Sequence, residues 1–457
     1  MTKYSAINTD DEISPQASNS NEIALESNDQ TPLLASHIPI ENDSLTSVGN
    51  ASSFSCAVNL ANTILGTGML AMPAAIASAG LIAGSMMILY AAFTSALGLF
   101  FLSRSAARTK GRNSSFFAVS KLTYPKAALF FDLAIAIKCF GVSISYLIII
   151  GDLMPQVVIA ICGSGYIDSN SLFLDRRFWI TVSMIVVVPL SFLKRLDSLR
   201  HTSFIALIAV VYLVFIVIYH YFGPDFEAPP KDKIHLINLS GKFLTNLPIF
   251  VFSFTCHQNT FSIYNELKDN AQTNVNSVIF TSIGVSALIY QVIGILGYLS
   301  FGDDVWPNII AMYHASTIIT IGRIAIVILV IFSYPLQCHP ARACLEKAIF
   351  SLQSISSKSP HVHTFSEVRY IFLTVALLIS SYTIAILVSK LDLVLAFVGS
   401  TGSTAVSFIL PGIFYYKFHE DTSWNYRKIL SVFLVVYGCL VMGVCLTMNI
   451  LRVIYRY

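Results

Sequence analysis

Long runs of apolar residues alternate with short polar segments along most of this 457-residue chain. A bilayer core about 30 Å thick is crossed by a helix of roughly 20 apolar residues. Runs of that length predict eleven membrane-spanning helices. Their approximate bounds are 53–79, 81–103, 129–161, 178–193, 202–222, 243–266, 275–299, 314–340, 368–388, 391–415 and 429–451.

Composition agrees with this pattern and narrows the class of protein. The chain is 55% hydrophobic and only 12% charged, whereas ordinary soluble domains carry about 25% charged residues. A net charge of +3 gives no reason to expect a nucleic-acid partner. The eight cysteines show no C-x-x-C spacing, so neither a metal site nor a redox motif is expected. We therefore expect an all-α membrane protein surrounded by lipid.

The first 50 residues differ sharply from the rest. They hold eight acidic residues and one basic residue, Lys3, and they lack the apolar run of a cleavable signal peptide. This composition predicts a disordered acidic tail. Within it, Asp29, Leu33 and Leu34 fit an acidic dileucine signal, which sorting adaptor complexes read on proteins bound for lysosomes or vacuoles. A chance match is the alternative.

Lysine and arginine in the loops predict the orientation of the chain. If the N-terminus is cytosolic, eighteen of these residues lie on the cytosolic side and eight on the other. We therefore expect a cytosolic N-terminus and, with eleven spans, a C-terminus across the membrane. The loop at 223–242 then lies outside the cytosol, and Asn238 within it is a candidate for glycosylation, although it stands very close to the next span.

Two of the predicted spans carry residues that break a membrane helix. The stretch NLANTILGTGMLAMP, residues 59–73, has Gly66-Thr67-Gly68 at its centre, and the sixth span is polar over 253–260. Unwound backbone is tolerated at membrane depth only where it lines a cavity. Transporters place such breaks at corresponding positions of two inverted repeats. Glycines that serve only helix packing are the plainer alternative.

The motifs themselves resemble those of the amino acid/auxin permease family. N-L-A-N-T-I-L-G-T-G-M-L-A-M-P-A-A resembles its opening signature, and T-C-H-Q-N-T-F-S-I-Y-N-E-L at 255–267 its sixth span. S-Y-P-L-Q-C-H-P-A-R at 333–342 and L-D-L-V-L-A-F-V-G-S-T-G-S-T at 391–404 resemble its eighth and tenth spans. The nearest resemblance is to the fungal vacuolar amino acid transporters.

This resemblance implies a particular fold and division of the chain. The fold would be that of the bacterial leucine transporter in the APC superfamily, with ten helices in two inverted repeats plus one. The acidic tail would occupy residues 1–50 and the transporter domain 51–457. Repeat one would cover about 53–222, repeat two about 243–415, and the extra helix about 429–451.

The resemblance also places an amino acid substrate beside the two breaks. N–H groups near Thr67 and Gly68 would hold its α-carboxylate at a helix N-terminus, and carbonyls around 253–255 would hold its α-ammonium. Tyr146 matches a family tyrosine near the carboxylate, or it packs elsewhere. The full set of candidate residues is Ile64, Gly66, Thr67, Gly68, Met69, Tyr146, Ser253, Phe254, Thr255 and Cys256.

Other polar residues are candidates for ion coupling or gating. Asn62 and Ser333 match positions that bind sodium in sodium-coupled relatives, or they hydrogen-bond between helices. His257 has an unperturbed pKa near 6.5 and is a candidate proton carrier, or a hydrogen-bonded fixture. Since vacuolar relatives are proton-driven, the proton is the expected coupling ion and no cofactor is expected.

Charged residues within spans require a partner or water. We expect Lys138 to pair with Glu266, either as a gate that opens during transport or as a structural ion pair, with Asp132 as a rival partner. Lys138 and Arg323 also hint at acidic substrates, although a paired or snorkelling arginine is the plainer interpretation.

These observations predict a secondary active amino acid transporter of the vacuolar membrane, coupled to protons and working by alternating access. A sodium-coupled symporter and an amino acid sensor signalling through the tail are the alternatives, whereas paired breaks argue against an open channel. An enzyme is not expected, because the histidines at 361 and 363 have no further catalytic or metal-binding groups beside them. The direction of transport and the list of substrates stay open.

Overall fold

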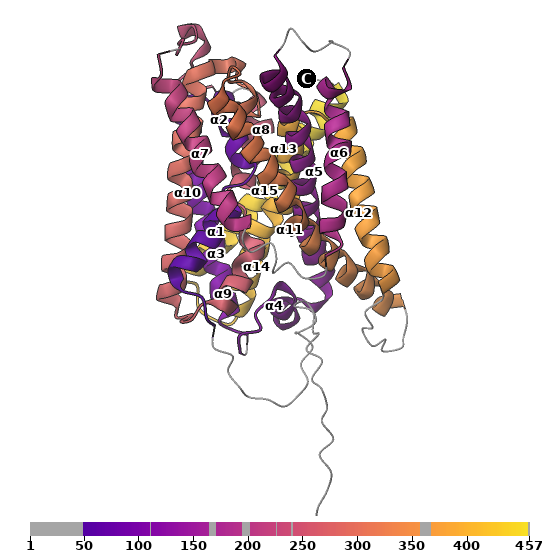
Figure 1. Cartoon of the computed structure of the whole chain (residues 1–457). Helices are drawn as coiled ribbons and strands as arrows, with labels where there is room; N and C mark the ends of the chain where they lie inside the picture. Colours follow the sequence, from indigo (N-terminus) through magenta and orange to yellow (C-terminus); the bar gives the residue numbers. More distant parts are fainter. Residues whose placement is uncertain are drawn as a thin grey trace, which may run out of the picture. The chain divides into compact units, whose positions relative to one another are not determined.

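The computed structural model describes residues 49–109, 111–163, 171–193, 202–224, 226–238, 241–356 and 367–455. They form helices joined by short connections (Figure 1). The helices are α1 (Ser53–Ile64), α2 (Gly68–Ala79), α3 (Leu81–Ala106), α4 (Phe116–Thr123), α5 (Ala128–Cys162), α6 (Arg176–Ser191), α7 (Thr202–Phe222), α8 (Gly241–Ser253), α9 (Thr260–Glu266), α10 (Gln272–Phe301), α11 (Thr317–Ser356), α12 (Glu367–Leu387), α13 (Leu391–Val398), α14 (Leu410–Phe418) and α15 (Tyr426–Tyr455).

The all-α prediction is confirmed for these residues, which contain no strand and only one isolated bridge, between Ala51 and Leu267. Among them, seven helices are long and apolar enough to cross a membrane, or up to eight if the bent pair α1–α2 counts as one span. The predicted spans at α6, at α7 and at α8 with α9 are also helical, but these helices are shorter or interrupted.

The first predicted span is broken where glycine stands. Helix α1 ends at Ile64, α2 begins at Gly68, and the two axes differ by 57°. Between them Leu65 has φ −75° and ψ 61°, which is outside the helical region. The Gly-Thr-Gly sequence therefore marks an actual interruption of the helix.

A second interruption occurs in the predicted sixth span. Helix α8 ends at Ser253, a single 3₁₀ turn covers His257–Asn259, and α9 begins at Thr260. Residues 254–256 lie between them outside any helix. The polar run in the sequence thus coincides with the break in the backbone.

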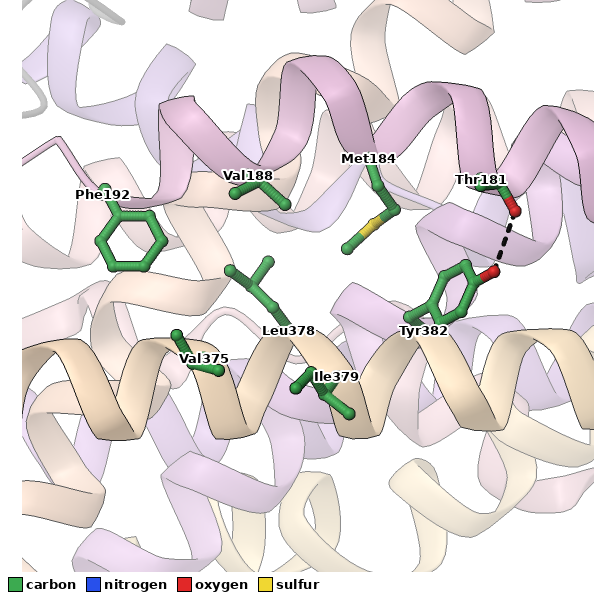
Figure 2. A pocket seen from close by; sticks show the side chains of 8 residues that line it. All are labelled: Thr181, Met184, Val188, Phe192, Val375, Leu378, Ile379 and Tyr382. Atoms are coloured by element: carbon green, nitrogen blue, oxygen red, sulfur yellow. Dashed lines mark hydrogen bonds between the residues drawn. The ribbon is translucent and has the colours of Figure 1, made fainter.

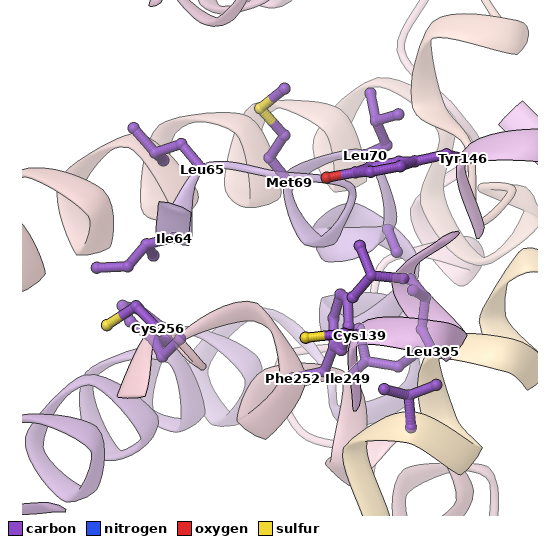
Figure 3. Packing of buried hydrophobic residues seen from close by; sticks show 14 of the residues in the cluster. Ile64, Leu65, Met69, Leu70, Cys139, Tyr146, Ile249, Phe252, Cys256 and Leu395 are labelled. Carbon is purple, nitrogen blue, oxygen red and sulfur yellow. The ribbon is translucent and has the colours of Figure 1, made fainter. Parts of the chain in front are cut away.

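Packing places these two breaks at the centre of the described helices. Helix α10 packs against α1, α2 and α3, while α8 packs against α2 and α13. The long helices α5 and α11 pack along each other, with α6 and α12 beside them. Apolar side chains around both breaks belong to one continuous buried core (Figure 3).

The predicted tenth span has an irregular middle that the sequence analysis did not anticipate. After α13 the chain continues as π-helical turns at Gly399–Ser403 and Ala405–Ile409 before α14 begins. Gly399 lies against α8, where an added Cβ would stand 2.7 Å from the Pro248 carbonyl carbon. Gly402 lies against α5, where an added Cβ would stand 2.7 Å from the backbone nitrogen of Lys138. Such π segments occur frequently at functional sites.

Candidate functional site

The two breaks touch each other directly. A Cβ added to Gly68 would lie only 2.8 Å from the Ser253 Cβ and would overlap its hydroxyl. Real Cβ atoms do not approach this closely, so any side chain at position 68 would push the two helix ends apart. Glycine is needed here for close approach, which explains why a membrane helix keeps this residue despite its cost.

The start of α2 presents two backbone N–H groups without acceptors. The amides of Leu65 and Gly66 bond to the Ala61 and Ile64 carbonyls. By contrast, the amides of Thr67 and Gly68 have no hydrogen-bond acceptor in the described part of the chain, and the Thr67 side chain does not cap the helix. Free N–H groups at a helix N-terminus favour an anion such as a carboxylate.

A tyrosine that the sequence analysis missed joins the two breaks. The Tyr290 hydroxyl, on α10, lies 2.6 Å from the Ile64 carbonyl and 2.9 Å from the Ser253 carbonyl. Its side chain is fully buried, and its ring packs edge-on against Phe254. One hydroxyl therefore bridges the carbonyl ends of α1 and α8. Nothing in the local sequence marks it, because the signal is a tertiary contact.

The carbonyls of the second break keep capacity for another donor. Ser253 accepts from Tyr290, and the Phe254 carbonyl accepts from the Ser95 hydroxyl at 2.9 Å. A carbonyl oxygen has two lone pairs, so each can accept one further hydrogen bond. An ammonium group is a suitable donor for them.

His257 is buried and hydrogen-bonded through both ring nitrogens. Its Nε2 lies 3.2 Å from the Ser95 carbonyl and must donate, since a carbonyl only accepts. Its Nδ1 lies 3.1 Å from the Ser407 hydroxyl, and that hydroxyl is also 3.1 Å from the Thr255 hydroxyl. These contacts hold the imidazole in a fixed position, and a role in carrying protons stays a prediction.

The remaining polar candidates lie around the breaks. The buried Tyr146 faces Ser333 on α11, and its neighbour Ser145 lies 3.4 Å from the Thr67 hydroxyl. Asn62 is half-buried on α1. The next residue of that helix, Thr63, accepts a hydrogen bond from the Asn259 side-chain amide at 2.9 Å.

Apolar side chains close over the breaks. Figure 3 shows Ile64, Leu65 and Met69 of the first break, Cys256 of the second, and Tyr146 of α5 around one region. All five are buried, while Gly66 is half-buried. The candidate site is therefore closed to solvent in this structure.

The expected ion pair of Lys138 is not formed in this structure. Within the described helices Lys138 has no ion pair or hydrogen bond, and Glu266 is exposed at the end of α9. Asp132 interacts with Lys347 and Cys344. Arg323 is held by the backbone, since its guanidinium donates to the Ile310 and Tyr313 carbonyls at 3.3 and 2.6 Å.

The far ends of the broken helices are fastened together. Ala51, just before α1, exchanges hydrogen bonds of 2.9 and 2.8 Å with Glu266 and Lys268, after α9. Arg112 donates to the Asn265, Leu267 and Lys268 carbonyls. The Asn265 side chain exchanges two further bonds with the Ser114 backbone. We call this group of contacts the α1–α9 tie.

A cavity of about 280 Å³ lies elsewhere, between α6 and α12 (Figure 2). Its walls are apolar apart from Thr181 and Tyr382, whose hydroxyls bond to each other at 2.9 Å. An amino acid would have to leave its two charges there without partners, which is costly. This cavity is therefore not a candidate for the substrate site.

Two other predicted sites fall outside or at the edge of the described residues. Asp29, Leu33 and Leu34 lie outside them. Asn238 is half-buried, and its backbone N–H donates to the Ala79 carbonyl at 2.6 Å. Its backbone is thus held at the α2–α3 junction, and its glycosylation stays a prediction.

Comparison with known families decides the class of the protein. The model of the family described as "Transmembrane amino acid transporter protein" matches residues 49–451, which include both breaks. The chain belongs to this family. Its function is therefore amino acid transport through a membrane, not catalysis.

Relatives in fungi extend the similarity along almost the whole chain. Vacuolar amino acid transporter 5 of Schizosaccharomyces pombe is 47% identical and matches 89% of this chain and 96% of its own. Vacuolar amino acid transporter 6 of Saccharomyces cerevisiae is 38% identical, matching 87% of this chain and 98% of its own. Vacuolar amino acid transporter 5 of Saccharomyces cerevisiae is 35% identical, matching 84% and 95%.

Proposed function

We propose that this protein is a proton-coupled secondary active transporter that moves amino acids between the vacuole lumen and the cytosol. Family membership supports amino acid transport. The names of the three fungal relatives reported above, all vacuolar amino acid transporters, support the vacuolar membrane. The observation that carries the proposal is the pair of touching helix breaks with free N–H groups at Thr67 and Gly68.

The substrate binds across these breaks in our proposal. The Thr67 and Gly68 amides take the α-carboxylate, and the Ser253 and Phe254 carbonyls take the α-ammonium with their remaining lone pairs. Such a site reads the part that all amino acids share. The candidates around it are Ile64, Gly66, Thr67, Gly68, Met69, Tyr146, Ser253, Phe254, Thr255 and Cys256.

Transport requires this closed site to open alternately to the two sides. We propose eleven spans in a 5+5+1 arrangement, with repeats at about 53–222 and 243–415, and a cytosolic acidic tail over residues 1–50. The excess of lysine and arginine on one side of the predicted spans supports the orientation. The correspondence of the two breaks, in the first and sixth predicted spans, supports the repeat.

Coupling is proposed to involve protons, as the resemblance of the sequence motifs to the vacuolar branch of the amino acid/auxin permease family implies. The candidates for coupling or gating are Asn62, Ser333, His257, Lys138 and Glu266. The neutral partners of His257 favour its role as a fixture of the second break over that of proton carrier. Sodium coupling through Asn62 and Ser333 is the alternative that the experiment below separates.

The test is amino acid flux into vesicles that contain the purified protein, with a pH gradient, a sodium gradient or neither. We expect flux driven by the pH gradient, and its sign distinguishes symport from antiport. Gly68→Val should abolish flux, because the new side chain would overlap Ser253. Gly284→Val is the matched control, since nothing lies within 4 Å of a Cβ at that position. Flux driven by sodium alone would contradict proton coupling, and no flux of any amino acid would contradict the transporter function.

A further inference from the structure

Lys138 is a buried cation without a partner beside the candidate site. The residue is 4% exposed, and it is the eleventh of the 35 residues of helix α5. Its ammonium makes neither a hydrogen bond nor an ion pair with any residue that the structure describes. Its position well inside an apolar helix makes this arrangement costly for a charged group.

Three acidic side chains of α5 and its neighbouring helices have other partners, whereas Glu346 on α11 has a carboxylate oxygen without a hydrogen-bond partner in the described residues but is not among the groups that act on Lys138. Asp132, on the same helix, interacts with Lys347 and Cys344. Asp152 lies 3.9 Å from Arg176, and Asp392 lies 2.6 Å from Arg452. None of them is among the groups that interact electrostatically with Lys138, which are cysteine thiols. No carboxylate of the described residues therefore compensates this lysine.

The position of Lys138 is at the second break. The groups that sense its charge are Cys256 and His257, in the break itself, and Cys139. On α5 it lies two helical turns before Ser145, on the same face, and Ser145 contacts Thr67 of the first break.

The segment that packs on Lys138 offers a second polar group. A Cβ on Gly402 would lie 3.0 Å from the Lys138 Cβ, so the π-helical turn Gly399–Ser403 covers this part of α5. In that turn the Ser403 hydroxyl is buried and has no hydrogen-bond partner in the described part of the chain. A hydroxyl without a partner thus belongs to the residue that follows the glycine packed on Lys138.

A buried cation without a charged partner is stabilised most by an anion that binds next to it. The substrate is the one charged group that the site is built to receive. Its α-carboxylate is already accounted for by the free N–H groups of α2, so a second carboxylate on the substrate would be the one available to Lys138. Arg323 offers no such opportunity, since its guanidinium is bonded to two backbone carbonyls.

We propose that Lys138 is a specificity-determining residue that binds the side-chain carboxylate of acidic amino acids. This inference rests on the proposed transport function and adds the substrate class to it. Aspartate and glutamate would bridge α2 and α5, with one carboxylate at each. Their amides, asparagine and glutamine, have the same shape but lack the charge that compensates Lys138, so they bind more weakly.

The experiment compares aspartate with asparagine as substrates of the same vesicle preparation. For the native protein we expect kcat/KM for aspartate to exceed that for asparagine at least tenfold. Lys138→Met should lower the aspartate-to-asparagine ratio about tenfold to a hundredfold, because charge-assisted hydrogen bonds are the strong ones. Lys138→Arg should retain most of the ratio. Lys121→Met, which changes an exposed lysine of α4, is the matched control and should change nothing.

A second measurement does not depend on any variant. Aspartate should raise the unfolding temperature of the purified native protein at concentrations where asparagine does not. The proposal is overturned if the native protein transports asparagine as well as aspartate, or if Lys138→Met lowers transport of both by the same factor. Either result leaves amino acid transport standing, whereas the proposed function itself fails only if no amino acid is moved.

Discussion

At the scale of single residues, Tyr290 determines how the two breaks are joined. Its hydroxyl carries one proton and faces two carbonyls, those of Ile64 and Ser253. Both carbonyls end a helix and have lost their usual helical donors. The Ile64 carbonyl already accepts from the Gly66 amide, so the hydroxyl proton matters most to the Ser253 carbonyl, which has no other donor in the described part of the chain and would otherwise be buried unsatisfied at a cost of about 1–3 kcal/mol.

Tyr290→Phe should loosen this junction without removing the ring. We expect the unfolding temperature to fall and KM for the amino acid substrate to rise several-fold, because the carbonyls that flank the substrate are no longer held in place. Thermal unfolding and flux measurements on the purified protein would check both effects.

Tyr298→Phe is the matched control for this change. Tyr298 is equally buried and lies two turns further along α10, but its hydroxyl accepts from the His235 amide at 2.8 Å, away from the breaks. Tyr298→Phe should lower the unfolding temperature without changing KM for the amino acid substrate. Equal effects of the two variants on KM would contradict a specific role for Tyr290.

The residues of the breaks differ in how visible they are in the sequence. Gly68 and Ser253 could be singled out because glycine and clustered polar groups are unfavourable in a membrane helix, so their presence there needs a reason. Tyr290 could not, because a tyrosine in an apolar helix is ordinary. Glu266 was expected to pair with Lys138 because the two residues were predicted to lie at a similar depth in the membrane. Depth alone does not determine which side chains face each other.

At the scale of elements, the α1–α9 tie joins segments that are more than 200 residues apart in the chain. Arg112 supplies hydrogen bonds to three carbonyls just where α9 ends. A cation at a helix C-terminus is also favoured by the helix dipole. The loop between α3 and α4 thus holds the ends of both broken helices.

Arg112→Ala should weaken the tie locally and leave the helices intact. Hydrogen bonds from a charged donor contribute roughly 1.5–3 kcal/mol each, so we expect amide hydrogen exchange at Ala51 and Lys268 to become at least tenfold faster. Mass spectrometry of exchange in lipid nanodiscs would measure it. Arg108→Ala is the control, because the hydrogen-bond partner of this neighbouring arginine among the described residues is His419, at 3.4 Å, and not the end of α9. Unchanged exchange in Arg112→Ala would show that the bridge at Ala51 holds by itself.

The helices could be predicted from the sequence where each corresponds to an apolar run long enough to cross a membrane. The long spans stand out because every residue on them faces lipid or core. The short helices α8 and α9 were found from their polar break rather than from length. The π-helical turns between α13 and α14 were not expected, because small residues such as Gly399 and Gly402 fit an ordinary tightly packed helix equally well.

At the scale of the whole molecule, the acidic tail is predicted to direct the protein to the vacuolar membrane and to take no part in amino acid transport. Removal of residues 1–45 behind a new start methionine should leave flux in vesicles unchanged and shift the protein away from the vacuolar membrane in cells. Fluorescence microscopy and flux of the same variant would check the two parts.

Leu33→Ala with Leu34→Ala is the smaller version of this change, and Leu25→Ala, in the same tail, is its control. If the double variant still reaches the vacuole, the dileucine pair is not the signal. If flux is lost on removal of the tail, the tail is part of the transport machinery and the sensor alternative gains support.

The tie between the ends of α1 and α9 limits the mechanical freedom of the carrier. Two half-helices that could each swing about its own break would give two independent angles, and some combinations would leave the path open at both ends. Because α1 and α9 are joined to each other through Ala51, and α9 also to Arg112, the two half-helices swing together. Their motion is then described by one angle. A carrier with one such coordinate leaks little, since every movement that opens one end is the same movement that closes the other.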